Sequence, residues 1–367
     1  MNENINAAMH LEHVTIKGFK SILSLDLDMR PINILIGANG AGKTNFISLF
    51  TFLRNLSIGK LQTYVEKQGF AATFFHFGAK HTAKISIDLT IGNSGYHVEL
   101  VHGVNDDSLI FEQEYCSTAG SNAQLTLKGR FGESGLAQPH LGGATRTNAY
   151  LGGCRVYHFH DTGVSAGYKQ ATELDGADYL YDDARNIAAF LYRLKHEYPA
   201  SYQDIVCAIQ TVTPFFHDFH LAPKGQAGNE KLILKWIHRD HDDPFSANQL
   251  SDGSARFICM ATLFLQPQAL KPNTIIIDEP ELGLHPAALA VLADMVKSAA
   301  KFSQVICSTQ SVTFANQFQP EDFIVVDQKA GASEFKRLEA EALKHWLDDY
   351  GMGDIWDKNL IGGRPQW

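Results

Sequence analysis

In the first third of the chain, apolar residues alternate with polar ones along several short stretches. Such alternation is typical of strands that are buried on one side. Turn residues at 18–21 and at 92–95 separate neighbouring runs. Both turns contain glycine, and each predicts a hairpin. We therefore expect antiparallel strands here. The runs concerned are residues 11–28 (two strands), 84–90, 96–101, 109–112 and 124–127.

Elsewhere the apolar residues form unbroken runs without alternation. A short run rich in β-branched residues is typical of a parallel strand that is buried on both faces. Several of these runs end in polar or acidic residues. Their side chains would therefore lie together at one edge of a predicted sheet, where they could take part in binding or catalysis. The runs are residues 32–36, 155–161, 274–278, 304–311 and 323–327, and a further strand is expected at 232–237.

Helical periodicity appears in a third set of segments. Residues 201–212 begin with Ser201 and Asp204 at capping-box spacing and are followed by Pro214. The glycine-rich stretch 132–153 has no periodicity, and we expect a long surface loop there. The other predicted helices are residues 46–56, 183–198, 257–265, a helix that begins near Pro286 and a short helix in the tail after Leu343.

Composition narrows the class of protein. The chain has 367 residues, of which 45% are hydrophobic, and a net charge of −9. That charge argues against strong, unaided binding to nucleic acid. No apolar run approaches the ~20 residues of a membrane span, and the N-terminus lacks the pattern of a signal peptide. The five cysteines are widely spaced, which suggests reduced thiols. We therefore expect a cytoplasmic protein with no membrane partner.

Residues 37–44 read G-x-x-x-x-G-K-[ST] without a mismatch, between a predicted strand and a predicted helix. This is the context of a phosphate-binding loop, whose backbone N–H groups surround an anion. Lys43 is expected to reach the β- and γ-phosphates of a nucleotide, and the Thr44 hydroxyl to bind Mg²⁺. A Rossmann fingerprint is excluded by Asn39. The expected nucleotide-binding residues of this loop are Gly37, Asn39, Gly40, Gly42, Lys43, Thr44 and Asn45.

Two carboxylates, Asp278 and Glu279, end the run at 274–278. Asp278 is expected to hold Mg²⁺, and Glu279 to orient or deprotonate the attacking water. The polar end of the run at 304–311, which includes Gln310, is expected to reach the γ-phosphate. The residues expected in catalysis are Glu279, Asp278, Lys43 and Gln310, and those expected at the metal are Thr44 and Asp278.

Two other polar clusters admit a metal-binding interpretation. His158 and His160 would share one face of a strand, with Asp161 beside them, but no second pair of ligands with defined spacing accompanies them. The alternative is a strand whose polar end faces the nucleotide. The tract 238–243 also contains several histidines and aspartates, and here a solvated turn is the favoured interpretation.

The order of these motifs resembles the ABC-type ATPase heads of the SMC and RecF proteins. The match rests on residues 37–44, on Leu250-Ser251-Asp252-Gly253-Ser254, on residues 277–286 and on Ser308-Thr309-Gln310-Ser311. Within that superfamily the chain is most similar to the RecF-type predicted ATPases, relatives of the overcoming-lysogenisation-defect ATPases. Residues 157–162 and the end Gly362-Gly363-Arg364-Pro365 also resemble that group.

The resemblance implies a homodimer in which ATP lies between two heads. Ser251 and Gly253 of one chain would then bind the γ-phosphate of the ATP held by the other. Asp252 replaces the usual glycine of that motif, and Gln310 stands where transporter ATPases usually carry histidine. A glutamine cannot take up a proton at neutral pH, so slow turnover is expected. Gln113 is a weak candidate for the glutamine that contacts Mg²⁺ in related heads.

The expected fold is an α/β, ABC-type P-loop ATPase head: a mixed central sheet flanked by helices, an antiparallel β lobe and an inserted, partly helical lid. We expect three lobes: a nucleotide-binding lobe at 1–56, a β-rich and then helical insertion at 57–230, and a lobe at 231–367 that carries the Ser251 motif and the paired carboxylates. SMC-like heptad arms and the C-terminal nuclease domain of the overcoming-lysogenisation-defect proteins are not expected.

Three functions remain open at this stage. The first is an ATP-driven dimer switch in phage defence that licenses a separate effector protein. The second is a RecF-like DNA-repair ATPase that binds DNA directly. The third, and the least favoured, is the ATPase subunit of a transporter.

Overall fold

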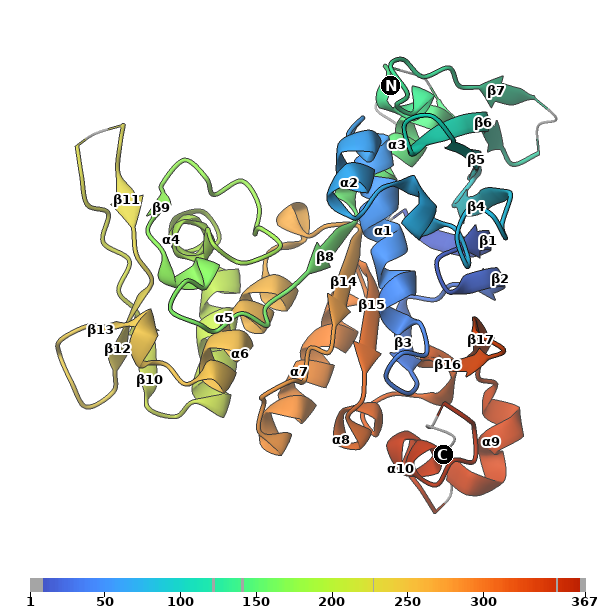
Figure 1. Cartoon of the computed structure of the whole chain (residues 1–367). Coiled ribbons are helices and arrows are strands. Elements are labelled where there is room, and N and C mark those ends of the chain that lie inside the picture. The colour runs from blue at the N-terminus through green and yellow to red at the C-terminus, as the bar shows by residue number, and fades with distance from the viewer. Residues whose placement is uncertain (1–8, 121–122, 140–141, 227, 348, 364–367) are drawn as a thin grey trace.

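Two six-stranded sheets lie on either side of helix α1 (Lys43–Ser57) in the computed structural model (Figure 1). The structure describes residues 9–120, 123–139, 142–226, 228–347 and 349–363. The arrangement confirms the expected mixed sheet with flanking helices and a separate antiparallel lobe. Within these described residues no helix is long and apolar enough to cross a bilayer.

The antiparallel sheet has the order β2-β1-β4-β5-β6-β7. The hairpin predicted at residues 84–101 is confirmed, and its turn consists of Gly92 and Asn93, because Ile91 pairs with Ser94. The sheet unites strands from both sides of residue 57. Its strands are β1 (Leu11–Phe19), β2 (Ile22–Asp28), β4 (Lys84–Ile91), β5 (Ser94–Gly103), β6 (Ser108–Thr118) and β7 (Gln124–Thr126).

The mixed sheet has the order β17-β16-β3-β15-β14-β8, and all its neighbours are parallel except β17 and β16. The prediction that the run at 274–278 is a central parallel strand is confirmed. The run at 323–327 was expected to be the last strand of this sheet, but β17 pairs with its outer side and forms the edge. The strands are β3 (Ile32–Ile36), β8 (Arg155–Tyr157), β14 (Thr274–Asp278), β15 (Gln304–Thr309), β16 (Phe323–Lys329) and β17 (Ala332–Arg337).

Successive side chains of these parallel strands point into different cores, as the pleat of a strand requires. In β14, Ile275 and Ile277 join the core that contains the helices from α4 (Ile187–Glu197) to α7 (Pro286–Ala299), whereas Ile276 joins the core between the two sheets. The same division holds in β3, β15 and β16. Burial on both faces explains why these strands are unbroken apolar runs in the sequence.

Residues 132–153 are not the long surface loop that the sequence suggested. They form a 3₁₀ turn at Gly135–Ala137 and helix α3 (Gly143–Gly153). Ala144, Thr147, Tyr150 and Leu151 are buried on one side of α3, which packs on α1 and on β5 and β6. Glycines at both ends of α3 hid this periodicity, because glycine is a poor helix former that is typical of loops.

Helices α4 to α7 share the core on the other face of the mixed sheet, and of these α7 packs on β15. Helix α4 (Ile187–Glu197) begins four residues later than predicted, after Ala184 adopts a left-handed backbone with φ of 56°. Helix α5 (Pro199–Val212) begins at Pro199, so the predicted cap at Ser201 is wrong. Proline is favourable in the first turn because no N–H is needed there. Helices α6 (Asp252–Leu265) and α7 (Pro286–Ala299) complete the layer.

The strand predicted at residues 232–237 is two strands that pair with different partners. Strand β11 (Lys231–Leu232) pairs with β9 (Thr172–Glu173), and β12 (Lys235–His238) lies between β10 (Phe216–Phe219) and β13 (Phe245–Ser246). The remaining helices are α2 (Leu61–Lys67), α8 (Val312–Ala315), α9 (Ala340–Leu347) and α10 (Met352–Asp357).

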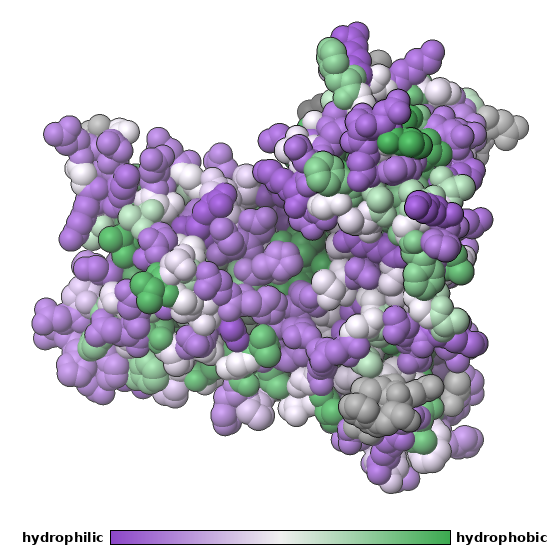
Figure 2. Space-filling view, in the orientation of Figure 1, coloured by the Kyte–Doolittle hydropathy of each residue, from purple (hydrophilic) through white to green (hydrophobic). Residues whose placement is uncertain are grey.

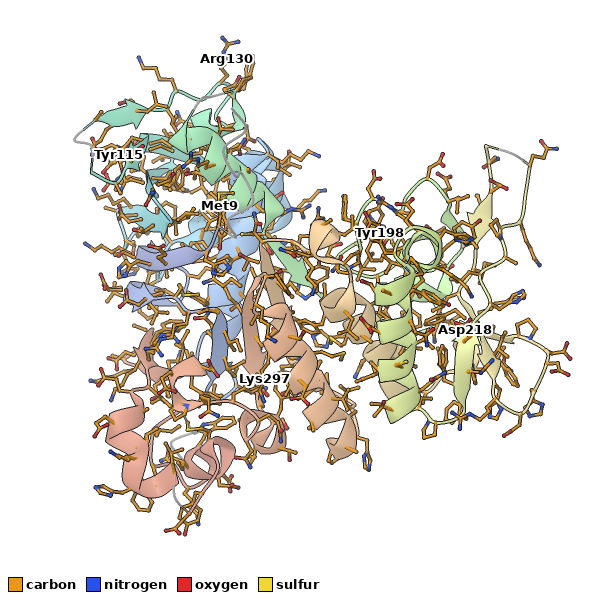
Figure 3. The ribbon with its side chains drawn as sticks, turned by 180° about the vertical axis from the view of Figure 1, so that it is seen from behind. Met9, Tyr115, Arg130, Tyr198, Asp218 and Lys297 are labelled. Carbon is orange, nitrogen blue, oxygen red and sulfur yellow. The ribbon has the colours of Figure 1, made fainter. Side chains whose placement is uncertain are left out.

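Viewed from behind, the helical part with Tyr198 and Asp218 lies on one side of α7 and the antiparallel sheet with Tyr115 lies on the other (Figure 3). A hollow separates these two parts in the space-filling view, and hydrophobic residues are visible at its floor (Figure 2). Most of the surface seen in that view is hydrophilic.

Candidate functional site

The phosphate loop connects β3 to α1, as its sequence predicted. The side chain of Lys43 folds back against the backbone of the loop. The Nζ atom donates hydrogen bonds to the carbonyl oxygens of Gly37 at 2.6 Å and Ala38 at 3.0 Å. Burial lowers the pKa of the lysine, and the charges of Glu279, Asp278 and Glu281 oppose that effect. These three carboxylates therefore lie close enough to Lys43 to stabilise its charge.

The backbone of the loop requires glycine where it enters the helix. Gly42 has a φ of 117°, and a Cβ there would collide with the side chain of Ser333 on β17. Ser333 Oγ in turn donates to the carbonyl of Ala41 at 2.6 Å, and its oxygen lies within hydrogen-bond distance of Ser21 Oγ, at 2.7 Å. Contact with β17 and with the turn between β1 and β2 thus fixes the loop from behind and leaves its other side for a ligand.

The carboxyl ends of β14 and β15 bring a second set of polar groups to this loop. Asp278 pairs in register with Ser308, whose hydroxyl donates to Asp278 Oδ1. Asp278 Oδ2 accepts a hydrogen bond of 3.3 Å from Thr44 Oγ1. The structure therefore brings together Thr44 and Asp278, the two residues that the sequence assigned to the metal.

Glu279 and Gln310 are also brought together. Gln310 Nε2 donates to Glu279 Oε1, and the Glu279 backbone N–H donates to the Ser308 carbonyl at 3.1 Å. Glu279 has a φ of 46°, in the left-handed region that a non-glycine residue rarely adopts. Such a backbone is retained only where the surrounding structure fixes it, and it turns the carboxylate out of the strand toward Gln310.

Glu281 is an acidic residue of this site that sequence analysis did not assign a role. Its Oε1 atom accepts hydrogen bonds from Thr309 Oγ1 at 2.6 Å and from the Gln310 N–H at 2.9 Å. Burial raises the pKa of this carboxyl. Glu281 therefore holds the end of β15 and so positions Gln310. Its place two residues after Glu279 gave no signal of this contact.

His158 also lies at this site. The sequence indicated this position, because the apolar run at 155–161 ends in polar residues. Strand β8 ends at Tyr157, which pairs with Ile277, so His158 follows at the level of Asp278. Burial lowers the pKa of His158 and the charge of Asp278 opposes the effect. His158 and His160 thus lie beyond the strand rather than on one face of it, and no group of three metal-binding side chains is found in the described part of the chain.

Ser251 and Gly253 lie at the beginning of α6. Ser251 Oγ caps the helix by accepting the N–H of Ser254 at 3.1 Å, so α6 begins at Asp252, before the predicted range of 257–265. Gly253 lies against the loop after β14, since a Cβ on it would come within 2.6 Å of the Gly283 carbonyl. Ser251 is exposed, so the beginning of α6 is open to a ligand from outside the chain.

Three other predicted residues have different surroundings. Asn39 is exposed at the tip of the phosphate loop, whereas the side chain of Asn45 donates to Ser21 Oγ at 2.7 Å. Gln113 lies on β6 of the antiparallel sheet, opposite Glu99, and lines a cavity formed by residues from 106–115 and 124–133 and by Gln62. The prediction that Gln113 contacts Mg²⁺ is wrong in this structure, because Thr44 and Asp278, the residues expected at the metal, meet at α1 and at the end of β14 in the other sheet.

Comparison with known proteins agrees with this geometry. Residues 9–131 match the family model "AAA ATPase domain", and residues 160–316 match the model "AAA domain, putative AbiEii toxin, Type IV TA system". The first range contains the phosphate loop, and the second contains Ser251, Asp278, Glu279 and Gln310.

Two DNA replication and repair proteins RecF match part of the sequence. The one from Paenarthrobacter aurescens is 32% identical over 93 residues, which is 25% of this chain and 21% of that protein. The one from Lactobacillus acidophilus is 31% identical over 84 residues, which is 23% of this chain and 22% of that protein. The match thus spans about a fifth of the length of these curated relatives.

The fold is similar to solved SMC heads. One is the SMC head bound to the C-terminal winged-helix domain of ScpA, with a TM-score of 0.58, 15% identity and coverage of 92% of this chain and 99% of that chain. Another, from Pyrococcus furiosus, has an extended coiled coil and is bound to the C-terminal domain of ScpA. It gives a TM-score of 0.60 at 13% identity, over 93% of this chain and 99% of that one. Two separate parts of the chain thus match models of AAA-type ATPase domains, and the α/β fold with its mixed sheet is similar to that of SMC heads.

Proposed function

We propose that this chain binds ATP with Mg²⁺ and hydrolyses it to ADP and phosphate. The proposal depends mainly on one contact: Thr44 Oγ1, at the end of the phosphate loop, lies 3.3 Å from Asp278 Oδ2, at the end of β14. The negative charges of Asp278 and Glu279 stabilise the charged form of Lys43. A buried lysine beside a loop of N–H groups is suited to the phosphates of a nucleotide.

The oxygen atoms of Thr44 and Asp278 fit Mg²⁺, which prefers hard oxygen ligands and few protein groups. The hydroxyl–carboxylate distance shows that both groups reach one point between α1 and β14. When bound, Mg²⁺ would neutralise charge on the β- and γ-phosphates. Ser308, through its bond to Asp278 Oδ1, fixes the orientation of that carboxylate.

Glu279 is proposed to orient and deprotonate the attacking water. The hydrogen bond from Gln310 Nε2 holds the Glu279 carboxylate and leaves its second oxygen to accept a proton from water. Gln310 itself has no group that takes up a proton near neutral pH. We therefore propose slow turnover, which suits a switch that must remain in its ATP state for some time.

The switch is proposed to be a homodimer. Ser251 and Gly253 lie at the exposed beginning of α6, where N–H groups and a hydroxyl are available to the γ-phosphate held by a second copy of the chain. Two phosphate loops and two α6 termini would then close around two ATP molecules. Asp252 adds a negative charge at this position, which would weaken the closed pair.

We propose that the switch acts in a DNA-linked process such as phage defence and that it licenses a separate effector protein. The solved SMC heads are bound to a second protein, ScpA, which supports a partner for this fold. The alternative is a RecF-like repair ATPase that binds DNA directly. The net charge of −9 counts against that alternative. A transporter subunit is the least favoured function, because Gln310 stands in place of the histidine of transporter ATPases.

The test is the solution mass of the Glu279→Gln protein with and without Mg²⁺-ATP, with Glu66→Gln, at an exposed position of α2, as the matched control. Glu279→Gln should bind ATP, hydrolyse it at least ~100-fold more slowly and double its mass only with ATP. A mass that ignores bound ATP would overturn the ATP-driven dimer. Failure to bind ATP at all would overturn the nucleotide site itself.

A second measurement separates the two DNA-linked roles. ATP turnover of the unmodified chain is followed with gapped duplex DNA, with intact duplex and without DNA, at low and moderate salt. Stimulation by gapped DNA that falls with salt would favour the repair role. Turnover that ignores DNA would favour the switch with a separate effector.

A further inference from the structure

One guanidinium group joins three segments that meet near the proposed site. Arg256, in the first turns of α6, donates from Nη1 to the Leu282 carbonyl at 2.9 Å and from Nη2 to the His160 carbonyl at 2.8 Å. Leu282 belongs to the loop after Glu279, and His160 belongs to the segment after β8. Arg256 thus connects the helix that carries Ser251 and Gly253 to both of those segments.

Helix α6 and the loop after β14 are in close contact around this guanidinium. A Cβ on Gly283 would come within 2.6 Å of Arg256 Nη1, and a Cβ on Gly253 would come within 2.6 Å of the Gly283 carbonyl. Gly283 has a φ of 75°, which an L side chain rarely adopts. The two glycines therefore permit a direct contact between the helix and the loop.

The segment His158 to Asp161 connects Arg256 to the nucleotide site. At its beginning, His158 stands at the level of Asp278 and is influenced by the charge of that carboxylate. Two residues later, the His160 carbonyl accepts the hydrogen bond from Arg256. A change in ligands around Asp278 that moves His158 would therefore also move the acceptor of Arg256.

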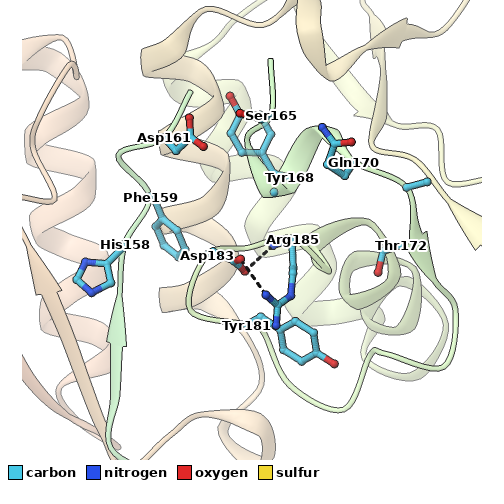
Figure 4. Close-up of a pocket in the computed structure, with 12 residues that line it drawn as sticks. His158, Phe159, Asp161, Ser165, Tyr168, Gln170, Thr172, Tyr181, Asp183 and Arg185 are labelled. Atoms are coloured by element: carbon cyan, nitrogen blue, oxygen red, sulfur yellow. Dashed lines mark hydrogen bonds and ion pairs between the residues drawn. The ribbon is translucent and has the colours of Figure 1, made fainter. Parts of the chain in front are cut away.

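This segment has space in which to move. It forms one wall of a cavity of about 430 Å³ that is also lined by Tyr168, Tyr181 and Arg185 (Figure 4). Well-packed interiors resist displacement, whereas a cavity of this size permits it. Arg256 also has a buried Nε with no acceptor among the described residues, so one of its donors is free for a rearranged state.

We propose that Arg256 is a positioning residue that makes the presentation of Ser251 and Gly253 depend on the nucleotide bound to the same chain. This rests on the proposed ATP switch. Occupation of the site beside Asp278 shifts His158 to Asp161, the shift reaches Arg256 through the His160 carbonyl, and α6 is placed for the ATP of the partner. Each chain then exposes a competent α6 only when its own site is filled.

The test uses Arg256→Met in the Glu279→Gln background, where methionine keeps the apolar length of the side chain but cannot donate. Three quantities are measured: ATP affinity, the dissociation constant of the ATP-dependent dimer, and hydrogen exchange of residues 158–163 and 252–256 at concentrations at which the chain is monomeric. ATP affinity should change by less than about threefold, and dimer association should weaken about tenfold or more. ATP should still alter exchange at 158–163 but no longer at 252–256.

Arg256→Lys should restore part of the association, because an ammonium can donate to one or both carbonyls. The matched control is Arg185→Met, whose guanidinium pairs with Asp183 on the cavity wall and which should leave all three quantities unchanged. Equal dimerisation and equal exchange at 252–256 in Arg256→Met and its parent would overturn the proposal. If the parent itself shows no ATP-dependent dimer, the dimer switch fails. The exchange data would then still show whether ATP reaches α6 through Arg256.

Discussion

Thr44 Oγ1 lies 3.3 Å from Asp278 Oδ2, so a hydroxyl at the beginning of α1 and a carboxylate at the end of β14 meet although 234 residues separate them in the sequence. Two elements that are far apart in the sequence thus contribute polar groups to the same place in the fold. Because hydroxyl and carboxylate oxygens are suitable ligands of Mg²⁺, this contact predicts that the two residues act as one unit in nucleotide binding.

Thr44→Val removes the hydroxyl and keeps the shape of the side chain. We expect the variant to lose most of the increase in ATP affinity that Mg²⁺ provides, by about tenfold, with little change in affinity for ATP in EDTA. The measurement is a titration with a fluorescent ATP analogue in both conditions. Thr44→Ser, which keeps the hydroxyl, is the control and should behave like the parent. Equal affinities of Thr44→Val and Thr44→Ser in Mg²⁺ would contradict the metal assignment.

The hydrogen bond from Gln310 to Glu279 predicts a role in turnover rather than in binding. Gln310→Ala should lower kcat about tenfold, because the carboxylate loses the group that orients it, and should leave ATP affinity within about twofold. Steady-state phosphate release and a binding titration give the two quantities. Gln268→Ala, at an exposed position, serves as the control. A variant that weakens ATP binding with kcat unchanged would show that Gln310 contacts the nucleotide and not the catalytic carboxylate.

Much of this site was predictable because its signals are local. The phosphate loop depends on glycines and a lysine within eight residues, and the run that ends in Asp278 and Glu279 is apolar because both faces of β14 are buried. The hairpin at 84–101 was predictable for the same reason, since alternation and a two-residue turn specify it.

The other features depend on contacts that no sequence window contains. Strands β11 and β12 are two strands and not one because they pair with different partners. Strand β11 pairs with β9, whereas β12 pairs with β10 and β13. His158 gains its place from the register of β8 with β14. Arg256 carries no motif signal at all, because its two acceptors belong to segments about 26 and 96 residues away.

Glu281 makes the stability of the fold depend on pH. Burial raises the pKa of this carboxyl above its ordinary value of 4.5, and its Oε2 is buried with no partner among the described residues. The unfolded chain therefore gives up this proton at lower pH than the folded chain does. The resulting stabilisation of the fold is fully present below the ordinary pKa and is lost as pH rises through the folded value.

Glu281→Gln should remove that dependence. We expect the variant to match the parent near pH 4.5 and to exceed it by about 1 kcal/mol at pH 8, where the parent must keep a buried charge. Thermal unfolding midpoints across this range measure the difference, and Glu66→Gln on the surface of α2 gives the baseline. A constant difference between Glu281→Gln and the parent at every pH would mean that the charge of Glu281 does not cause it.

The helix α3 offers a separate test, because the sequence suggested a loop there. Tyr150 is buried, accepts a hydrogen bond from Thr274 Oγ1 at 2.7 Å and donates to Gln304 Oε1 at 3.1 Å. Gln304 also donates to the carbonyl of Leu11 at 2.8 Å. The phenol therefore ties α3 to the beginnings of β14, β15 and β1.

Tyr150→Phe should destabilise the chain by about 1 kcal/mol or slightly more, because it leaves buried oxygen and hydroxyl groups of Gln304 and Thr274 with fewer partners. The midpoint of thermal unfolding measures this, with Tyr350→Phe, at an exposed position, as the matched control. In a surface loop the two changes would be equally silent. A larger effect at Tyr150 thus distinguishes a packed helix from a loop, and it does so at a residue that the proposed nucleotide site does not contain.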